Sequence, residues 1–124
     1  MTKTSLEISK DFTFDAAHYF EHKDDAHPFS RMHGHSFAGT VTLSGDPADD
    51  SGMVKDFWEI ESEINKLKDQ LDHRLLNEVE GLDHPSLEAI AKWVFERLDK
   101  SLPGLVSVEI RRPSCGEKAV LRRS

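Results

Sequence analysis

The first half of the chain holds two stretches in which apolar and polar residues alternate with a period of two, the pattern of half-buried β-strands. One stretch runs from Leu6 to His18 and the other from His33 to Asp46. One face of the first carries its even-numbered positions: Leu6, Ile8, Phe12, Phe14, Ala16 and His18. One face of the second carries its odd-numbered positions: His35, Phe37, Gly39, Val41 and Leu43. Only a polar loop, residues 19–32, separates them, so the two strands are predicted to pair antiparallel.

The middle of the chain changes to the spacing of amphipathic helices. Asp56 is predicted to cap a helix that ends near Leu71, and Glu59 completes a capping-box-like pair. Ser86 is predicted to cap a second helix, which must stop before Pro103-Gly104. The predicted buried stripe of the first helix is Phe57, Ile60, Ile64, Leu67 and Leu71. That of the second is Leu87, Ile90, Ala91, Val94, Phe95 and Leu98.

Alternation returns near the carboxyl terminus. Leu105 to Arg112 reads as a third strand with Val106, Val108, Ile110 and Arg112 on one face, and Glu117 to Arg123 as a fourth. The order ββααββ predicts an α+β fold in which a four-stranded antiparallel sheet carries both helices on one face. Such a sheet has two open edges, so we expect copies of the chain to associate through their sheets.

Length and charge narrow the possible functions. The 124 residues suit one domain, and 16 basic against 23 acidic residues give a net charge of −7, which disfavours a general nucleic-acid binder. No apolar run approaches the roughly 20 residues of a membrane span, and the polar start does not resemble a signal peptide. Cys115 is the single cysteine, so no internal disulfide is expected. These features predict a soluble cytoplasmic protein.

His33-Gly34-His35 is the first candidate site. Histidines two residues apart on a strand point to the same side, and His18 ends the alternating face of the neighbouring strand. Three imidazoles with a fourth coordination position left open form the ligand set of a catalytic zinc site. The alternative is that these histidines are ordinary core or surface residues.

Asp72-His73, after the first helix, is the candidate proton carrier, because a carboxylate can orient an imidazole that takes up a proton. The alternative is a His placed favourably near the helix end. His27, in the loop before His33, is a second candidate, although most loop histidines are merely solvated.

Five segments of the chain resemble the 6-pyruvoyl-tetrahydropterin synthase and 6-carboxy-tetrahydropterin synthase family. In order they are FTFDAAH (12–18), MHGHSF (32–37), GMVKDF (52–57), LDHRLLN (71–77) and PSLEAIAKW (85–93). Together they span most of the chain and are highly specific.

The resemblance implies a tunnelling fold, in which the sheets of several subunits, a trimer or a dimer of trimers, close into a barrel. It implies Zn²⁺ on His18, His33 and His35, and a proton-transfer role for Asp72 and His73. The implied substrate is 7,8-dihydroneopterin triphosphate, and the bacterial branch forms 6-carboxy-5,6,7,8-tetrahydropterin with acetaldehyde and triphosphate, for queuosine synthesis. Pterin contacts are implied at the start of the second helix, at Ser86 and Glu88.

Two positions depart from the family pattern. Phe29 stands where the family has a catalytic cysteine, and Arg112 aligns with a glutamate that grips the pterin. A guanidinium only donates hydrogen bonds, so Arg112 suits a carboxylate, phosphate or carbonyl; Glu109 and Glu117 are acidic alternatives if the alignment shifts.

Three hypotheses follow. The chain is a lyase in which His27 or the Asp72-His73 pair compensates for the missing thiol, a related enzyme with a different substrate, or a non-catalytic protein that binds zinc and a heterocycle.

Overall fold

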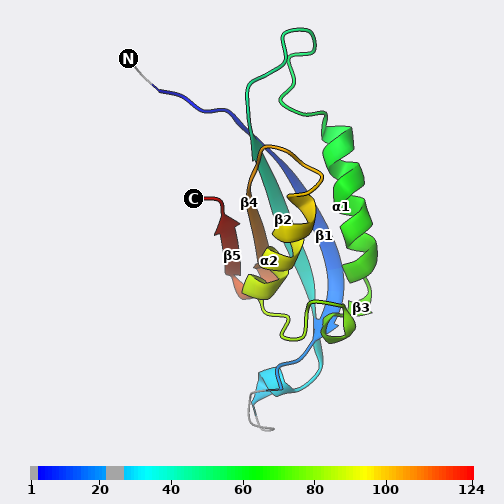
Figure 1. Ribbon diagram of the computed structural model, residues 1–124. Helices are drawn as coiled ribbons and strands as arrows, with labels where there is room; N and C mark the ends of the chain where they lie inside the picture. Colours follow the sequence, from blue (N-terminus) through cyan, green and yellow to red (C-terminus); the bar gives the residue numbers. More distant parts are fainter. Residues whose placement is uncertain (1–2, 22–26) are drawn as a thin grey trace.

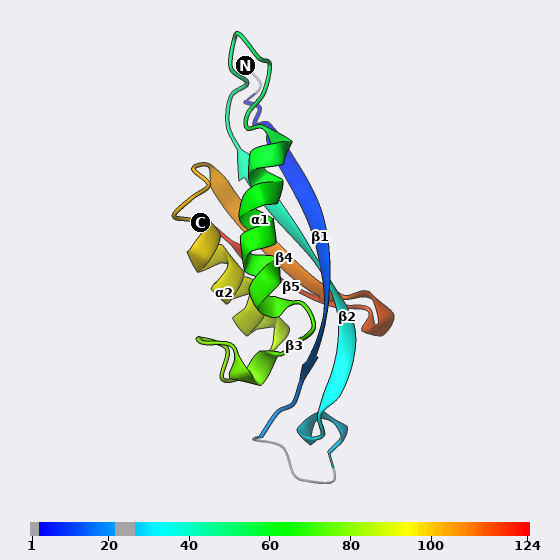
Figure 2. The same ribbon diagram turned by 90° about the vertical axis from the view of Figure 1, so that its right-hand side faces the viewer.

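Five strands form one sheet, and two α-helices cover one of its faces in this computed structural model, which describes residues 3–21 and 27–124 (Figures 1 and 2). The strands are β1 (Glu7–His18), β2 (His33–Ser44), β3 (Arg74–Leu75), β4 (Leu105–Arg112) and β5 (Glu117–Arg122). The helices are α1 (Phe57–Leu71) and α2 (Leu87–Leu98). The strands lie side by side in the order β3-β1-β2-β4-β5.

The long β1–β2 hairpin confirms the predicted alternation. Its antiparallel register places Phe14 opposite Phe37 and His18 opposite His33. Phe14 and Phe37 are almost fully buried and stack with ring centroids 5.0 Å apart, so the predicted apolar faces look towards the helices. Leu6 is an exception: it precedes β1 and is 48% exposed. Residues 22–26 of the predicted loop between the strands lie outside the described residues.

The prediction of four antiparallel strands was wrong by one strand. Arg74–Leu75 forms β3, which pairs parallel with Ala16 and Ala17 of β1, so the order of elements is ββαβαββ. A two-residue strand is too short to show any periodicity, which is why the sequence pattern did not reveal it. β3 sits at the edge of the sheet directly after α1 and carries the chain past the end of β1.

The predicted caps form, and most of the predicted helical stripes are buried. Asp56 accepts a hydrogen bond from the backbone of Trp58, and Ser86 from that of Ala89. Phe57 departs from the prediction because it is 48% exposed at the first position of α1, beyond the end of the packed stripe. The buried residues of the two helices are Ile60, Ile64, Leu71, Leu87, Ile90, Ala91, Trp93, Val94 and Leu98.

A bulge shifts the start of β4. The register moves from Thr42↔Ser107 to Leu43↔Leu105, leaving Val106 as the extra residue. Leu105 is therefore buried where Val106 was expected, while Val108 and Ile110 face the core as predicted. β4 then turns into β5 with Arg112 opposite Glu117.

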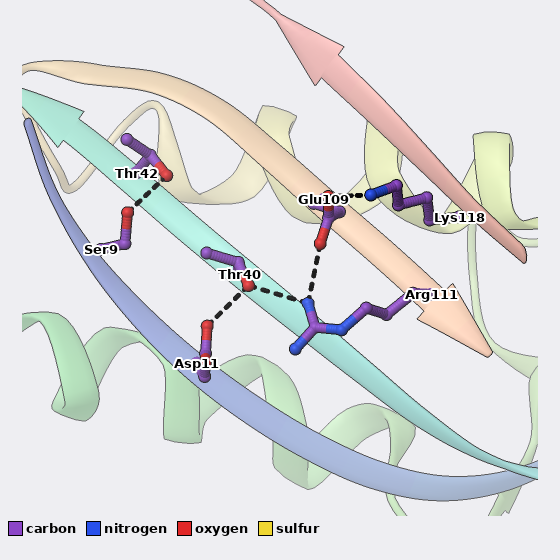
Figure 3. A network of polar contacts seen from close by, with 7 residues as sticks. All are labelled: Ser9, Asp11, Thr40, Thr42, Glu109, Arg111 and Lys118. Carbon is purple, nitrogen blue, oxygen red and sulfur yellow. Dashed lines mark hydrogen bonds and ion pairs between the residues drawn. The ribbon is translucent and has the colours of Figure 1, made fainter. Parts of the chain in front are cut away.

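The face of the sheet away from the helices is polar. Figure 3 shows its central network, in which Thr40 donates to Asp11 at 2.6 Å and accepts from Arg111 at 2.8 Å. Arg111 also pairs with Glu109 at 2.9 Å. Polar side chains on this face and apolar ones on the other confirm the predicted two-layer α+β fold. Among the described residues, neither helix is both long and apolar enough to cross a bilayer.

Candidate metal centre

Three imidazole rings gather where β1 ends and β2 begins. His18 is the last residue of β1 and lies opposite His33, the first residue of β2, while His35 follows two residues later on the same face. The ring centroids are 4.5 Å apart for His18 and His33, 5.1 Å for His18 and His35, and 4.9 Å for His33 and His35. One ring nitrogen from each residue lies within 4.8 Å of the other two.

Backbone carbonyl groups orient two of these rings. His18 Nδ1 lies 2.9 Å from the carbonyl oxygen of Pro85, and His33 Nδ1 lies 2.7 Å from that of Arg31. A carbonyl oxygen only accepts, so each Nδ1 carries the proton and each Nε2 keeps its lone pair. The Nε2 atoms of all three histidines are buried without a hydrogen-bond partner among the described residues.

The surroundings favour the neutral form of His18 and His35. Burial, reinforced by the neighbouring imidazoles, lowers the pKa of His18 to about 4. Burial and the neighbouring His33 also lower the pKa of His35. Neutral imidazole is the form that binds a metal, and three converging lone pairs leave room for a further ligand. The donor set therefore fits a divalent transition-metal ion.

The predicted Asp72-His73 pair also forms. Asp72 Oδ2 lies 3.0 Å from His73 Nδ1, and Asp72 Oδ1 accepts a hydrogen bond of 2.9 Å from the backbone N–H of Asp15. The Asp15 amide and then the His73 ring lower the pKa of Asp72, so this carboxylate stays ionised. His73 has a φ of 59°, uncommon for a residue other than glycine, and its side chain is 79% exposed. The pair is thus fixed against β1 with its imidazole open to solvent.

A hollow of about 610 Å³ lies beside the Asp72-His73 pair. His35 of the histidine cluster and His73 of the pair both line it, together with Asp15, Gly34 and Ser36. Gly34, between the two metal-ligand candidates, has no side chain to fill this space. Asp15, Gly34 and Ser36 alternate with the candidate ligands along β1 and β2, so this hollow opens on the strand face opposite to the histidine rings.

The fold and the cluster can now be compared with known proteins. A family model described as 6-pyruvoyl tetrahydropterin synthase matches residues 7–124, which is nearly the whole chain. The chain belongs to this family.

Individual relatives agree with the assignment. A 6-carboxy-5,6,7,8-tetrahydropterin synthase from Synechocystis is 41% identical over 109 residues, covering 83% of this chain and 83% of its own length. A dihydroneopterin monophosphate aldolase from Pyrococcus furiosus is 35% identical over 105 residues, covering 85% and 83%. The structure of the 6-pyruvoyl tetrahydropterin synthase of Caenorhabditis elegans has a TM-score of 0.85 at 26% identity, covering 98% of this chain and 97% of that one.

Phe29 lies beside His33, at the edge of the histidine cluster. Their ring centroids are 6.0 Å apart, and the ring of His27 lies 5.0 Å from Phe29 on its other side. His27 Nδ1 accepts a hydrogen bond of 3.1 Å from the Phe29 backbone, so its proton resides on Nε2. His27 therefore lies one aromatic ring away from the histidine cluster and is not part of it.

The start of α2 lies beside the cluster, because Pro85 holds His18. Ser86, predicted to contact substrate, uses its hydroxyl oxygen to cap α2 through a 3.1 Å hydrogen bond from Ala89. Glu88 is exposed in the first turn of the same helix. The structure places both near the metal centre, and Glu88 has the freer side chain.

Arg112 ends β4 on the helix-facing side of the sheet. Its side chain is only 12% exposed, and Nη2 pairs with Glu117 Oε1 at 2.8 Å. After burial and the neighbouring imidazoles, the positive charge of Arg112 also contributes to the lowered pKa values of His18 and His35. Glu109, the other acidic alternative, lies on the opposite face with Arg111 and so away from the cluster.

Two contributors escaped the sequence analysis: the carbonyl groups of Pro85 and Arg31. Every residue carries a carbonyl, so no sequence signal marks one as a partner of an imidazole. Only the position of the α2 start, 67 residues after His18, supplies the first of these contacts.

Proposed function

We propose that the chain is a zinc-dependent lyase that converts 7,8-dihydroneopterin triphosphate and water into 6-carboxy-5,6,7,8-tetrahydropterin, acetaldehyde and triphosphate. The observation that carries this proposal is the set of three imidazoles whose Nε2 atoms converge without a partner among the described residues. Membership of the family and a relative with that printed name support the choice of substrate. The product would serve queuosine synthesis in the cytoplasm.

His18, His33 and His35 would hold the zinc ion through Nε2. When bound, zinc would supply Lewis acidity towards the oxygens of the substrate side chain. The Pro85 and Arg31 carbonyls would keep two ligand rings in the correct tautomer and orientation.

Asp72 and His73 would move the protons. Because Asp72 stays ionised and accepts from His73 Nδ1, the other ring nitrogen is free to take a proton and return it. The ionised carboxylate would also stabilise the imidazolium formed in between. A substrate side chain in the hollow that His73 lines would lie within reach of this ring.

Phe29 cannot transfer a proton, so a second proton carrier would have to come from elsewhere. His27 is the nearest candidate across the Phe29 ring. Cys115 is exposed on the short turn after β4. We assign the role to His27 and give Cys115 none.

The pterin ring would be held near the start of α2. The exposed carboxylate of Glu88 can accept hydrogen bonds from the amino-pyrimidine edge of a pterin, which presents donors. Ser86 would contribute mainly by fixing that helix terminus.

Assembly would bring several copies together. β5 is an edge of the sheet, and β3 covers β1 only at Ala16 and Ala17, so much of β1 is also a free edge. We propose a homo-oligomer, a trimer or a dimer of trimers, that joins these edges.

The test is to incubate zinc-loaded protein with 7,8-dihydroneopterin triphosphate and identify the products by mass spectrometry. The proposal predicts 6-carboxy-tetrahydropterin, with turnover reduced at least roughly a hundredfold in His73→Ala. His84→Ala, which removes an exposed histidine outside the hollow, serves as the matched control and should retain activity.

A second candidate is aldol cleavage of a phosphorylated dihydroneopterin, favoured by the loss of a thiol at Phe29 and by the relative named for such a reaction. Cleavage between the first two side-chain carbons would leave a hydroxymethyl group on the ring and release the other two carbons as a phosphorylated hydroxyaldehyde. The same mass spectra distinguish the two products. Tight binding of the substrate without any product would instead indicate a non-catalytic binding protein.

A further inference from the structure

Among the described residues, four buried side-chain nitrogens have no hydrogen-bond partner. Three are the Nε2 atoms of the candidate metal ligands. The fourth is Nε of Arg112. It differs in kind from the other three, because it carries a proton and can only donate. A metal ion cannot satisfy it.

The sheet places this donor beside the metal centre. Arg111 lies opposite Ala38, so Arg112 is level with Phe37, and β2 continues from there to His35 and His33. Arg112 has the same parity as Val108 and Ile110, whose side chains are buried under the helices. Its guanidinium therefore lies on the face that carries the cluster, at the same end of the sheet.

Glu117 fixes the guanidinium from the other side. It lies opposite Arg112 in the β4–β5 register and binds Nη2 at 2.8 Å, while its own side chain is 51% exposed. This contact leaves Nε free. The Glu117 carboxylate supplies one negative charge. A divalent ion and the Arg112 guanidinium together would bring three positive charges to this region. An anionic ligand atom would balance the excess and accept from Nε.

We propose that Arg112 is a specificity-determining residue whose Nε–H donates to an oxyanion of the metal-bound ligand, with Glu117 as the residue that positions it. This inference rests on the proposed function, since the oxyanion is a carboxylate or a phosphate of a pterin compound. It predicts that the site prefers ligands carrying that anion over neutral pterins of the same size.

The test is calorimetric titration of zinc-loaded, full-length protein with 6-carboxypterin, 6-hydroxymethylpterin and inorganic triphosphate. Arg112→Gln should lower the affinity for 6-carboxypterin or triphosphate at least roughly tenfold, as expected for loss of a hydrogen bond to a charged group. The affinity for 6-hydroxymethylpterin should stay within about twofold of the wild-type value. Glu117→Gln should weaken the same anions to a smaller extent. Zinc affinity, measured by competition with a chelator, should not fall in Arg112→Gln, because removal of a nearby positive charge does not weaken the binding of a cation.

Arg111→Gln is the matched control, because the guanidinium of Arg111 lies on the face of the sheet away from the cluster (Figure 3). It should leave all three ligands unaffected. If triphosphate displaces 6-carboxypterin, the two anions share the Arg112 position; if only 6-carboxypterin depends on Arg112, the oxyanion is its carboxylate.

Equal losses for the neutral and the anionic pterin in Arg112→Gln, or no loss for either anion, would overturn the inference while leaving the proposed function intact. Absence of pterin binding with Arg112-dependent triphosphate binding would overturn the proposed function and retain the oxyanion position. Absence of binding by all three ligands would overturn both.

Discussion

Replacing His18 and His33 separately by alanine should distinguish the contribution of each ring to packing from its contribution to metal binding. His18 is fully buried: its ring contacts Phe20 and Phe37 at centroid distances of 5.0 and 5.6 Å and bonds to the carbonyl of Pro85. Loss of such a ring costs about 3 kcal/mol, and loss of the hydrogen bond about 1 kcal/mol. Removing the unpartnered Nε2 returns about 1 kcal/mol, so without metal His18→Ala should destabilise the protein by about 3 kcal/mol.

His33 should behave differently without metal. It is partly exposed and keeps one hydrogen bond, to Arg31 at the edge of the hairpin, so His33→Ala should cost about 1 kcal/mol or less. A chain of this length changes its melting temperature by about 4 °C per kcal/mol. The metal-free variants should therefore melt about 12 °C and at most about 4 °C below the wild type.

Zinc should change this pattern. At a free concentration 100 times its dissociation constant, zinc stabilises the wild type by about 2.7 kcal/mol, or about 11 °C. Both variants lose one of three ligands, so both should lose most of this gain despite their different metal-free stabilities. The assay is thermal unfolding at fixed chain concentration with chelator or with buffered zinc, with His84→Ala as control. If zinc stabilised His33→Ala as much as the wild type, His33 would not be a ligand.

Three further substitutions test the fold and the proton-transfer pair, each by denaturant unfolding. Gly104→Ala should destabilise by about 2 kcal/mol or more, because Gly104 has a φ of +91° and an added Cβ would lie 2.8 Å from the carbonyl oxygen of Ser44; a neutral effect would contradict this. Asp56→Ala should cost about 1 kcal/mol through loss of the α1 cap, and an unchanged midpoint would argue against the cap. The pKa of Asp72 lies below its ordinary value of 3.8, so this carboxylate stabilises the fold above that pH and loses its effect as the pH falls through its folded value. Asp72→Asn should therefore be less stable than wild type at pH 6 and approach it at pH 3, whereas a constant difference would exclude the Asp15 contact as the cause.

Most of the sheet and the metal centre could be predicted from the sequence, because both depend on local periodicity. Alternation along β1 and β2 placed His18 and His35 on one face, and the short connection made antiparallel pairing the simple solution. Their convergence is then a matter of register, which the buried phenylalanines of the same face determine. The starts of the helices could also be predicted, because Asp56 and Ser86 are typical N-cap residues.

Other features depend on contacts between distant parts of the chain. β3 exists because the end of α1 returns to β1, and two residues show no pattern of their own. The β4 bulge reflects how Leu105 fits against Leu43, which alternation alone does not specify. The Arg112–Glu117 pair depends on the register across the turn between β4 and β5.

The most direct test of the account is the coordination of the bound metal. X-ray absorption of the zinc-loaded protein should show one zinc per chain with three histidine nitrogens at about 2.0–2.1 Å and one further light atom. Coordination by a sulfur atom, or by fewer than three imidazoles, would contradict the central claim that His18, His33 and His35 hold one ion.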